Sequence, residues 1–425
     1  MRLRGDDIMK VCVFTLGSRG DVQPYVALGK ELIRQGHSAV ICTGESFRTL
    51  IEENGVEFHR TESDLMAFAN TEDGKAILEE PMKNWRLALR YSKELLNPAY
   101  RKTLDDFFDA AKDADIILYH PKALGAVDIA LHYGIPCVSM PPVPITYPTP
   151  EFPNLALTTK NLGATLNKLT YLVNAKAEQS QMQEINDFRK KTLGLPKRKA
   201  GIYTCNDGSR EIPTVYPVSG KLFPEVTSWD GHVFLPGFFF LEGNEKLEPE
   251  MEEFLAAGAK PIVITFSSMP LKQPDIFLEK LKNALKETNN RAVILTGNSG
   301  MQAADDPTIY VTKAAPHNLL FPRTKGILHH GGAGTMAAAL RSGVPQLIMP
   351  GSVDQPFWAE RLHRLGYAPE PIREKTVTEN SLAEAFRRFD DPLAQEKASM
   401  IGTEIQNENG TIQAVRYLET LVDKG

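Results

Sequence analysis

Short apolar runs alternate with segments of helical periodicity through both halves of the chain. In the first half the runs predict strands, with helices between them, at Lys10–Leu16, Ala39–Thr43, Val56–His59, Ile116–His120 and Pro136–Met140. The second half repeats the plan, with runs at Pro261–Phe266, Ala292–Leu295, Ile309–Thr312, Ile327–Leu328 and Gln346–Met349. Continuous apolar runs are typical of parallel strands that are covered on both faces. The pattern therefore predicts an α/β protein of βαβ units with parallel sheets.

The 425 residues are enough for two domains of ordinary size. We expect a first domain over 1–240 and a linker over 241–250, where an acidic, polar stretch follows an apolar run. A second domain is expected over 251–395, and the chain stays polar and helical over 396–425. Residues 1–8 precede the first strand and have no apolar segment, so we expect a dispensable leader or a misassigned start.

One stretch of the second half carries most of the candidate chemistry. His329 and His330 follow a predicted strand, the glycine turn Gly331–Gly334 comes next, and a helix is expected from about Thr335. A glycine turn that opens a helix directs unpaired N–H groups and the positive end of the helix dipole at one point, which suits a phosphate. His330 abuts the turn, so we expect it to contact the ligand more closely than His329 does. Thr335 adds a hydroxyl group.

The glycines also fit a rival motif. Gly332-Ala-Gly334-Thr-Met-Ala337 matches the dinucleotide fingerprint G-x-G-x-x-G/A, and Asp354 lies 20 residues beyond Gly334, where a ribose-binding acid would lie. However, the helix has room only for about Thr335–Ser342, which is short for a Rossmann crossover. Asp354 also lies beyond Pro350-Gly351 and not at a strand end.

A packing turn without a ligand would explain the glycines alone, but not the histidines, Thr335 and the polar pair Asp354-Gln355 together. Asp354 and Gln355 supply the acceptors and donors that sugar hydroxyls need. The stretch therefore favours a nucleotide sugar over a dinucleotide.

In the first half, Asp21 ends the short loop Gly17–Asp21 after the first predicted strand. Ligands of parallel sheets bind at the carboxyl ends of strands, where a carboxylate can act as a general base. Asp21 also precedes the helix expected at Val22–Gln35, where it would be a good N-cap. The residues alone leave both roles open.

These two stretches carry a resemblance to a known family. His330–Thr335 followed by Asp354-Gln355-Pro-Phe-Trp358 resembles the nucleotide-sugar signature of family 1 glycosyltransferases, closest to the sterol glucosyltransferase-like and antibiotic enzymes. Gly17–Pro24 extends the resemblance to nearly the whole chain. It implies the GT-B fold, with two Rossmann-like domains facing an interdomain cleft, an inverting reaction and no bound metal. It also implies that the helix over 396–425 crosses back onto the first domain.

The resemblance assigns roles to residues. It implies Asp21 as the general base and a nucleotide sugar, UDP-glucose first and a thymidine donor second, as substrate without any cofactor. The implied donor residues are Ser268, His317, His330, Gly332, Gly334, Thr335, Asp354 and Gln355. Ser267 departs from the family, which has glycine before the serine at 268, and this puts the backbone approach to the diphosphate in question.

The acceptor side is apolar. The proline-dense segment Pro141–Pro153 follows a strand end and is expected to be extended and stiff, so it can form a pocket wall with Tyr147 and Phe152. The irregular helical stretch 61–102 adds Trp85 and other apolar residues. Such a surface favours a sterol, triterpenoid or phenolic alcohol as the acceptor. A plain linker and ordinary core packing remain the alternatives.

Charge and composition narrow the partners. The net charge of −5 gives no general attraction to nucleic acid. Asp113-Ala-Asp115 matches the metal-binding D-x-D of another glycosyltransferase fold, but ordinary strand-entry aspartates explain it better. The basic segments Arg189–Lys191 and Lys197–Lys199 favour a solvated face, with contact to an anionic membrane surface as the alternative.

The cysteines at 12, 42, 137 and 205 have no C-x-x-C spacing, and no apolar run reaches membrane-spanning length. We therefore expect reduced thiols and a cytoplasmic location.

Two other functions stay open. One is a non-catalytic protein that binds nucleotide sugars, and the other is a hexose epimerase of the same fold.

Overall fold

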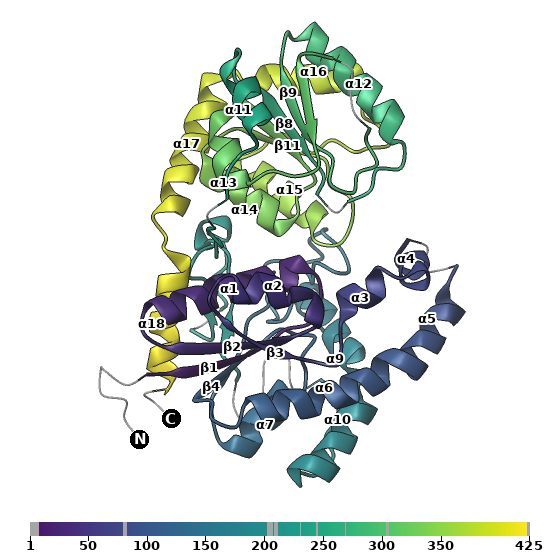
Figure 1. Cartoon of the computed structure of the whole chain (residues 1–425), viewed down its shortest axis with the longest axis vertical. Helices are drawn as coiled ribbons and strands as arrows, with labels where there is room; N and C mark the ends of the chain where they lie inside the picture. Colours follow the sequence, from purple (N-terminus) through teal and green to yellow (C-terminus); the bar gives the residue numbers. More distant parts are fainter. Residues whose placement is uncertain are drawn as a thin grey trace. The chain divides into compact units, whose positions relative to one another are not determined.

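A computed structural model describes residues 8–79, 83–201, 207, 211–229, 231–243, 245–267, 269–302 and 306–422 (Figure 1). The chain divides into two compact units. Unit 1 comprises Met1–Gly243 together with Asn409–Gly425, and unit 2 comprises Asn244–Glu408. Each unit contains a parallel sheet with helices around it, and the predicted α/β class is confirmed.

Within the described part of unit 1, seven parallel strands form one sheet in the order β3-β2-β1-β4-β5-β6-β7. The strands are β1 Lys10–Phe14, β2 Ser38–Thr43, β3 Glu57–Arg60, β4 Ile116–Tyr119, β5 Cys137–Ser139, β6 Thr214–Val215 and β7 Val233–Phe234. The helices are α1 Arg19–Arg34, α2 Arg48–Glu52, α3 Leu65–Ala69, α4 Glu72–Glu79, α5 Trp85–Tyr91, α6 Asn97–Ala110, α7 Ala126–Tyr133, α8 Ala164–Thr170, α9 Leu172–Gln179, α10 Met182–Phe188 and α18 Gly410–Val422. Short 3-10 or π turns lie at Glu45–Phe47, Ser92–Leu96, Arg189–Leu193 and Gly220–Leu222.

Strand β1 shows why the apolar runs predicted buried strands. Val11 and Val13 belong to the core on one face of the sheet, whereas Cys12 and Phe14 belong to the core on the other. Both faces are therefore covered, which is the condition for a continuous apolar run. Helix α18 packs beside α1 on the first of these faces (Figure 1).

Unit 2 is smaller and has the same plan. Its described residues form a sheet of five parallel strands in the order β10-β9-β8-β11-β12. The strands are β8 Ile262–Thr265, β9 Ala292–Leu295, β10 Ile309–Thr312, β11 Gly326–His329 and β12 Gln346–Ile348. The helices are α11 Pro249–Ala256, α12 Pro274–Glu287, α13 His317–Leu320, α14 Ala333–Ser342, α15 Gln355–Leu365, α16 Glu379–Arg388 and α17 Pro392–Gln406, with a 3-10 turn at Phe321–Arg323.

The stretch expected as one helix over 396–425 returns to unit 1, as the resemblance implied, but it is not one helix. The structure has two helices there, α17 in unit 2 and α18 in unit 1. They are separated at Asn407–Asn409, and Asn409 adopts a left-handed backbone with φ +53°. Asparagine and glycine tolerate that conformation and end helices, so Asn409-Gly410 was a sequence signal for the break.

The basic segments are not simply a solvated face. The side chains of Arg189 and Arg198 are buried and form ion pairs with the fully buried Asp128, and Arg198 also pairs with Glu178. Four lysines of the same segments, Lys190, Lys191, Lys197 and Lys199, are exposed. The arginines therefore hold the helices together, and only the lysines face solvent.

The D-x-D has the ordinary explanation. The Asp115 carboxylate accepts the backbone N–H of Lys10 at 2.7 Å, at the entry to β1. Among the described residues, no group of three or more histidines, cysteines or acids is arranged to hold a metal. None of the described helices is both long and apolar enough to cross a membrane.

Candidate functional site

Strand β11 ends at a histidine whose contacts are all within the protein. His329 is fully buried, its Nε2 lies 2.9 Å from Oε1 of Gln346, and its Nδ1 accepts the backbone N–H of Gly331 at 3.0 Å. Because Nδ1 accepts, the neutral ring carries its proton on Nε2 and donates it to Gln346. Burial lowers the pKa of His329 to about 3, so the ring is neutral at pH 7. His329 is thus part of the fold.

His330 is different. Its side chain is buried, and its Nδ1 has no hydrogen-bond partner in the part of the chain that the structure describes. The ring lies against Gly332, where a Cβ atom would be 2.4 Å from Nε2. Burial lowers the pKa of His330 to about 4, which makes this ring neutral as well. A buried polar atom without a partner costs about 1–3 kcal/mol, so His330 is the histidine whose contacts leave it available to a ligand.

Helix α14 begins beside His330 with an open first turn. Its N-cap is Gly332, which has no side chain to cap the helix. The helical hydrogen bonds start with the N–H of Met336, which donates to the Gly332 carbonyl at 2.9 Å. The N–H groups of residues 333–335 have no carbonyl partner within the helix. Gly334 is exposed, and a Cβ there would meet no atom within 4 Å, so packing does not require glycine at 334. Thr335 is buried in the same turn.

The polar pair lies where α15 begins. Asp354 is the N-cap residue, and its Oδ2 accepts the indole N–H of Trp358 at 2.8 Å. Gln355 Oε1 accepts the backbone N–H of Gly351 at 2.8 Å. Between them and β12, Val353 has φ +61°, which strains a β-branched residue. Gln355 therefore holds the loop on both sides of Val353, whereas Asp354 bonds to its own helix, and both side chains stay half-buried.

The remaining donor candidates lie beside other strands of unit 2. Ser268 lies outside the described residues. Its neighbour Ser267 has φ +51°, and its carbonyl accepts the N–H of Asn298 at 2.7 Å. Serine therefore adopts the left-handed backbone that favours glycine at this position. His317 starts α13 and stacks on Phe321, with ring centroids 4.4 Å apart.

In unit 1, Asp21 lies inside the first turn of α1 and not before it, because the helix begins at Arg19 with Ser18 as N-cap. Its Oδ2 accepts the Ser18 backbone N–H at 2.7 Å, which is the reciprocal half of a capping box. Gly17, with φ +144°, makes room for this carboxylate, since a Cβ at 17 would lie 2.1 Å from Oδ2. The expectation that Asp21 is the N-cap is therefore wrong, because Ser18 is the N-cap and Asp21 is the third residue of the helix.

Asp21 also meets two residues that follow β4, the neighbouring strand of β1. His120 Nε2 lies 3.0 Å from Oδ1, and Lys122 Nζ lies 2.9 Å from Oδ2. Burial raises the pKa of Asp21, but the hydrogen bond and charge of His120 and the charge of Lys122 outweigh it, so the pKa lies well below its usual value. Burial lowers the pKa of His120 more than Asp21 raises it. The pair is therefore an ionised carboxylate and a neutral imidazole at pH 7.

The hydrogen bonds of His120 determine which atom can take a proton. Its Nδ1 accepts the backbone N–H of Lys122 at 3.1 Å, so Nε2 carries the ring proton and donates it to Asp21 Oδ1. Both ring nitrogens are then occupied. Oδ2 of Asp21 accepts from Ser18 and Lys122, whereas Oδ1 accepts, among the described residues, from His120 alone. Oδ1 is thus the atom of this cluster with a lone pair left.

Comparison with known proteins decides the family. Residues 11–116 match the glycosyltransferase family 28 N-terminal domain, and residues 289–421 match the erythromycin biosynthesis protein CIII-like C-terminal domain. O-mycaminosyltylonolide 6-deoxyallosyltransferase of Streptomyces fradiae is 30% identical over 425 residues, covering 97% of each chain. The chain belongs to this family of glycosyltransferases.

A second relative is the sterol 3-beta-glucosyltransferase UGT80A2 of Arabidopsis thaliana, which is 32% identical over 417 residues. The alignment covers 96% of this chain but 65% of the plant protein, so the chain spans just under two thirds of that relative. Among solved structures, the glycosyltransferase of kitacinnamycin superposes with a TM-score of 0.71 at 21% identity, covering 97% of this chain and 99% of that one. The fold of this glycosyltransferase is therefore GT-B.

The acceptor candidates of this glycosyltransferase fall into different environments. Trp85 is 51% exposed on α5, and Tyr147 is half-buried, with its backbone N–H bonded to the Tyr216 hydroxyl at 2.9 Å. Phe152 is buried and packs against Phe223 and Trp229. These ring contacts anchor the proline-rich segment, and Phe152 as an acceptor contact stays a prediction.

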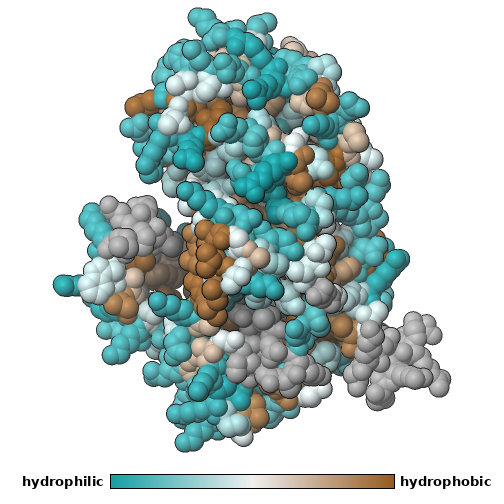
Figure 2. Space-filling view, turned by 180° about the vertical axis from the view of Figure 1, so that it is seen from behind, coloured by the Kyte–Doolittle hydropathy of each residue, from teal (hydrophilic) through white to brown (hydrophobic). Residues whose placement is uncertain are grey.

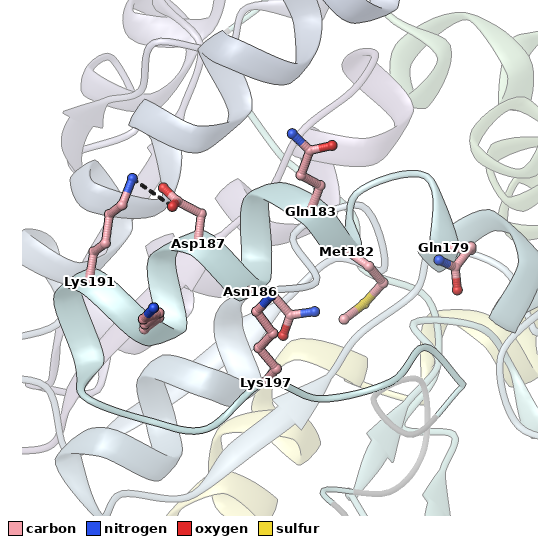
Figure 3. Close-up of a pocket in the computed structure, with 8 residues that line it drawn as sticks. Gln179, Met182, Gln183, Asn186, Asp187, Lys191 and Lys197 are labelled. Carbon is pink, nitrogen blue, oxygen red and sulfur yellow. Dashed lines mark ion pairs between the residues drawn. The ribbon is translucent and has the colours of Figure 1, made fainter.

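A pocket of about 580 Å³ lies beside α10 (Figure 3). Figure 3 shows Lys191 directed at Asp187, and the ion pair is 2.7 Å long. The lining residues are Gln179, Met182, Gln183, Asn186, Asp187, Lys190, Lys191 and Lys197. None of the residues expected to contact the donor or acceptor, or to act as the base, lines this pocket.

His120 and Lys122 are the site residues that sequence reasoning missed. A usable signal existed, because His120 directly follows the apolar run of β4. In a parallel sheet the residue after one strand lies at the same edge as the loop after its neighbour. Recognising it required knowing that β1 and β4 are adjacent, and strand order is not contained in periodicity.

Proposed function

We propose that the protein is an inverting glycosyltransferase that moves glucose from UDP-glucose to a hydroxyl group of an apolar acceptor. The observation that carries the proposal is the buried Nδ1 of His330, which has no partner among the described residues and lies beside the open first turn of α14. A neutral imidazole N–H, three helix N–H groups and the dipole at one point match a diphosphate.

On the donor side, negative charge develops on the diphosphate as the glycosidic bond breaks. His330, the Thr335 hydroxyl and the N–H groups of residues 333–335 would donate to that charge, and their positions are already set by the fold. The amide nitrogen of Gln355 remains as a donor for a sugar hydroxyl, and one carboxylate oxygen of Asp354 is braced by Trp358.

On the acceptor side, Oδ1 of Asp21 would take the proton of the acceptor hydroxyl as the oxygen attacks the anomeric carbon from the face opposite the diphosphate. The neutral His120 would hold the carboxylate in place through its Nε2–H. The low pKa of Asp21 keeps it ionised, but it also makes a weak base. Lys122 is half-exposed, and withdrawal of its ammonium group would raise the basicity of Asp21 when acceptor binds.

The acceptor class rests on surface chemistry and on the name of the plant relative. Tyr147 and Trp85 offer apolar rings with few fixed polar groups, and such surfaces bind by area and select weakly among shapes. We propose sterols, triterpenoids or phenolic natural products as acceptors.

The test is incubation with UDP-glucose or TDP-glucose and a panel of sterol, triterpenoid and phenolic acceptors. Products would be read by mass spectrometry and the anomeric configuration by NMR. We expect a β-glucoside with stoichiometric release of UDP. Glycosylation of small hydrophilic sugars with every apolar alcohol inert would exclude the proposed acceptor class.

A protein that binds nucleotide sugars without transferring them is the second candidate. The observation in its favour is the saturated Oδ2 and low pKa of Asp21, which suit a purely structural carboxylate. Tight UDP binding without product from any acceptor would support it. A changed sugar in the absence of an acceptor would instead indicate an epimerase.

A further inference from the structure

Helices α8 and α9 present their leucines to solvent. The two helices follow each other almost without interruption, separated only by Tyr171, and Leu162 comes just before them. Five leucines of this segment have between 43% and 66% of their surface exposed: Leu157, Leu162, Leu166, Leu169 and Leu172. The last four are spaced by four, three and three residues, so they form one stripe along the helical face. Figure 2 shows a patch of hydrophobic side chains gathered on the surface viewed from behind.

The opposite face of these helices is polar and buried, which is the reverse of an ordinary surface helix. Asn167 is fully buried, and its side-chain amide donates to the Pro150 carbonyl at 2.8 Å. Asn174 donates to the Ile145 carbonyl at 3.0 Å. Turning the helices to bury the leucines would break these bonds and leave buried amides unsatisfied. The exposure of the leucines is therefore imposed by the fold.

The same face is positively charged. Lys160, Lys168 and Lys176 are exposed, and the sequence contains no aspartate or glutamate between Phe152 and Ala177. This local charge of +3 contrasts with the net charge of −5 for the whole chain. Leucines flanked by lysines match the interfacial region of a bilayer, where apolar side chains enter the acyl boundary and ammonium groups meet anionic headgroups.

We propose that residues 157–176 dock unit 1 onto an anionic lipid bilayer. Charge complementarity selects the lipid surface over a second copy of the chain, since two like-charged faces would repel each other. The basic segments first considered for membrane contact contribute less, because Arg189 and Arg198 are consumed by buried ion pairs. The inference does not depend on the proposed acceptor, since docking requires neither donor nor acceptor.

The experiment is co-sedimentation of the full chain with sucrose-loaded vesicles of phosphatidylcholine, with or without phosphatidylserine. We expect binding only when phosphatidylserine is present, weakening as salt rises. The double variant Leu166→Gln/Leu169→Gln should weaken binding roughly a hundredfold or more, because two leucines no longer enter the bilayer. The triple variant Lys160→Gln/Lys168→Gln/Lys176→Gln should weaken it on the order of a hundredfold and remove the salt dependence.

The matched control is Leu393→Gln/Met400→Gln on α17 in unit 2, where the side chains are 56% and 60% exposed. This variant should bind vesicles like the parent chain, and thermal melts should show all three variants folded. Failure of the parent chain to bind, equal binding to both vesicle types, or unchanged binding of the leucine variant would each overturn the proposal. So would a parent dimer that the leucine variant converts to a monomer, since that would identify the face as an interface between copies. UDP release assayed with a detergent-dispersed acceptor tests the proposed function separately.

Discussion

The loops after β11 and after β1 have the same backbone plan, but they differ in which polar groups are already hydrogen-bonded. Both follow a buried strand, contain glycines with positive φ at Gly331 and Gly17, and lead directly into a helix. In the β11 loop the helix start has no side-chain cap, and His330 keeps a buried nitrogen without a partner among the described residues. In the β1 loop the Asp21 carboxylate already accepts from Ser18, His120 and Lys122.

The difference teaches how the same βα unit can prepare two kinds of chemistry. A helix start without a side-chain cap, such as that of α14 (the open loop below), can bind a ligand that carries negative charge. In the loop after β1 (the closed loop below), the Asp21 carboxylate supplies the negative charge, and the donors around it keep it ionised and oriented. The loop after β11 therefore suits a diphosphate ligand, and the loop after β1 suits an acceptor hydroxyl group that meets the fixed carboxylate of Asp21.

The strongest test of the closed loop is Asp21→Asn. If Oδ1 of Asp21 takes the acceptor proton, kcat/KM should fall by about 10²–10⁴ while UDP affinity stays unchanged. The measurements are steady-state kinetics and UDP titration. Because the new amide group would face His120 or Lys122, a thermal melt must accompany them. Near-normal turnover with a lower melting temperature would assign Asp21 a capping role only.

In the open loop, the two histidines should separate by function. His330→Ala should weaken UDP binding by roughly 10- to 150-fold, since a hydrogen bond to a charged group is worth about 1.5–3 kcal/mol. His329→Ala should mainly destabilise the fold, because both of its nitrogens bond within the protein. Calorimetric titration and thermal melts distinguish the two outcomes. Equal losses of UDP affinity in both variants would contradict the assignment.

Two glycines of the open loop offer a finer comparison. Gly334→Ala should leave the melting temperature unchanged or higher, because the new Cβ meets no atom of the protein, yet weaken UDP binding about tenfold. Gly332→Ala should lower both, since its Cβ would collide with the His330 ring. Unchanged UDP affinity in Gly334→Ala would show that no ligand approaches that turn.

The charge that closes the β1 loop should be visible in the pH profile. Lys122→Gln removes a cation that lowers the pKa of Asp21, so the acid limb of kcat/KM should move to higher pH. The low pKa of Asp21 should also make the free energy of unfolding of the parent chain depend on pH. The folded pKa lies below the reference of 3.8, so this contribution is complete above that pH and is lost as pH falls through the folded value. If the acid limb does not move in this variant, Lys122 does not influence the pKa of Asp21.

The smallest effect concerns a third strand end. Ser267 adopts φ +51°, which costs a non-glycine residue about 1–2 kcal/mol, whereas glycine has an entropic cost of about 0.5–1 kcal/mol. Ser267→Gly should therefore stabilise unit 2 by up to about 1 kcal/mol in denaturant unfolding. The matched control is Asn289→Gly at the same φ of +51°, where asparagine is tolerated and a smaller gain is expected.

Much of the fold could be read from apolar runs. Ala292–Leu295 and Ile309–Thr312 have the predicted bounds, and the strand at Lys10 ends two residues earlier than expected. The two-residue strands β6 and β7 were missed, because a strand that short leaves no periodicity to detect. The break before α18 was missed as well, although Asn409-Gly410 signalled it.

The sequence by itself determined the α/β class, the strand-end placement of Asp21 and His330, and the family, because these depend on local pattern and on short motifs. Only the tertiary structure decided the rest. It placed His120 and Lys122 on Asp21 and covered Phe152 with aromatic rings. It also turned the polar face of α8 and α9 inward. Each of these depends on which elements become neighbours, and that is set by the free energy of packing the whole chain.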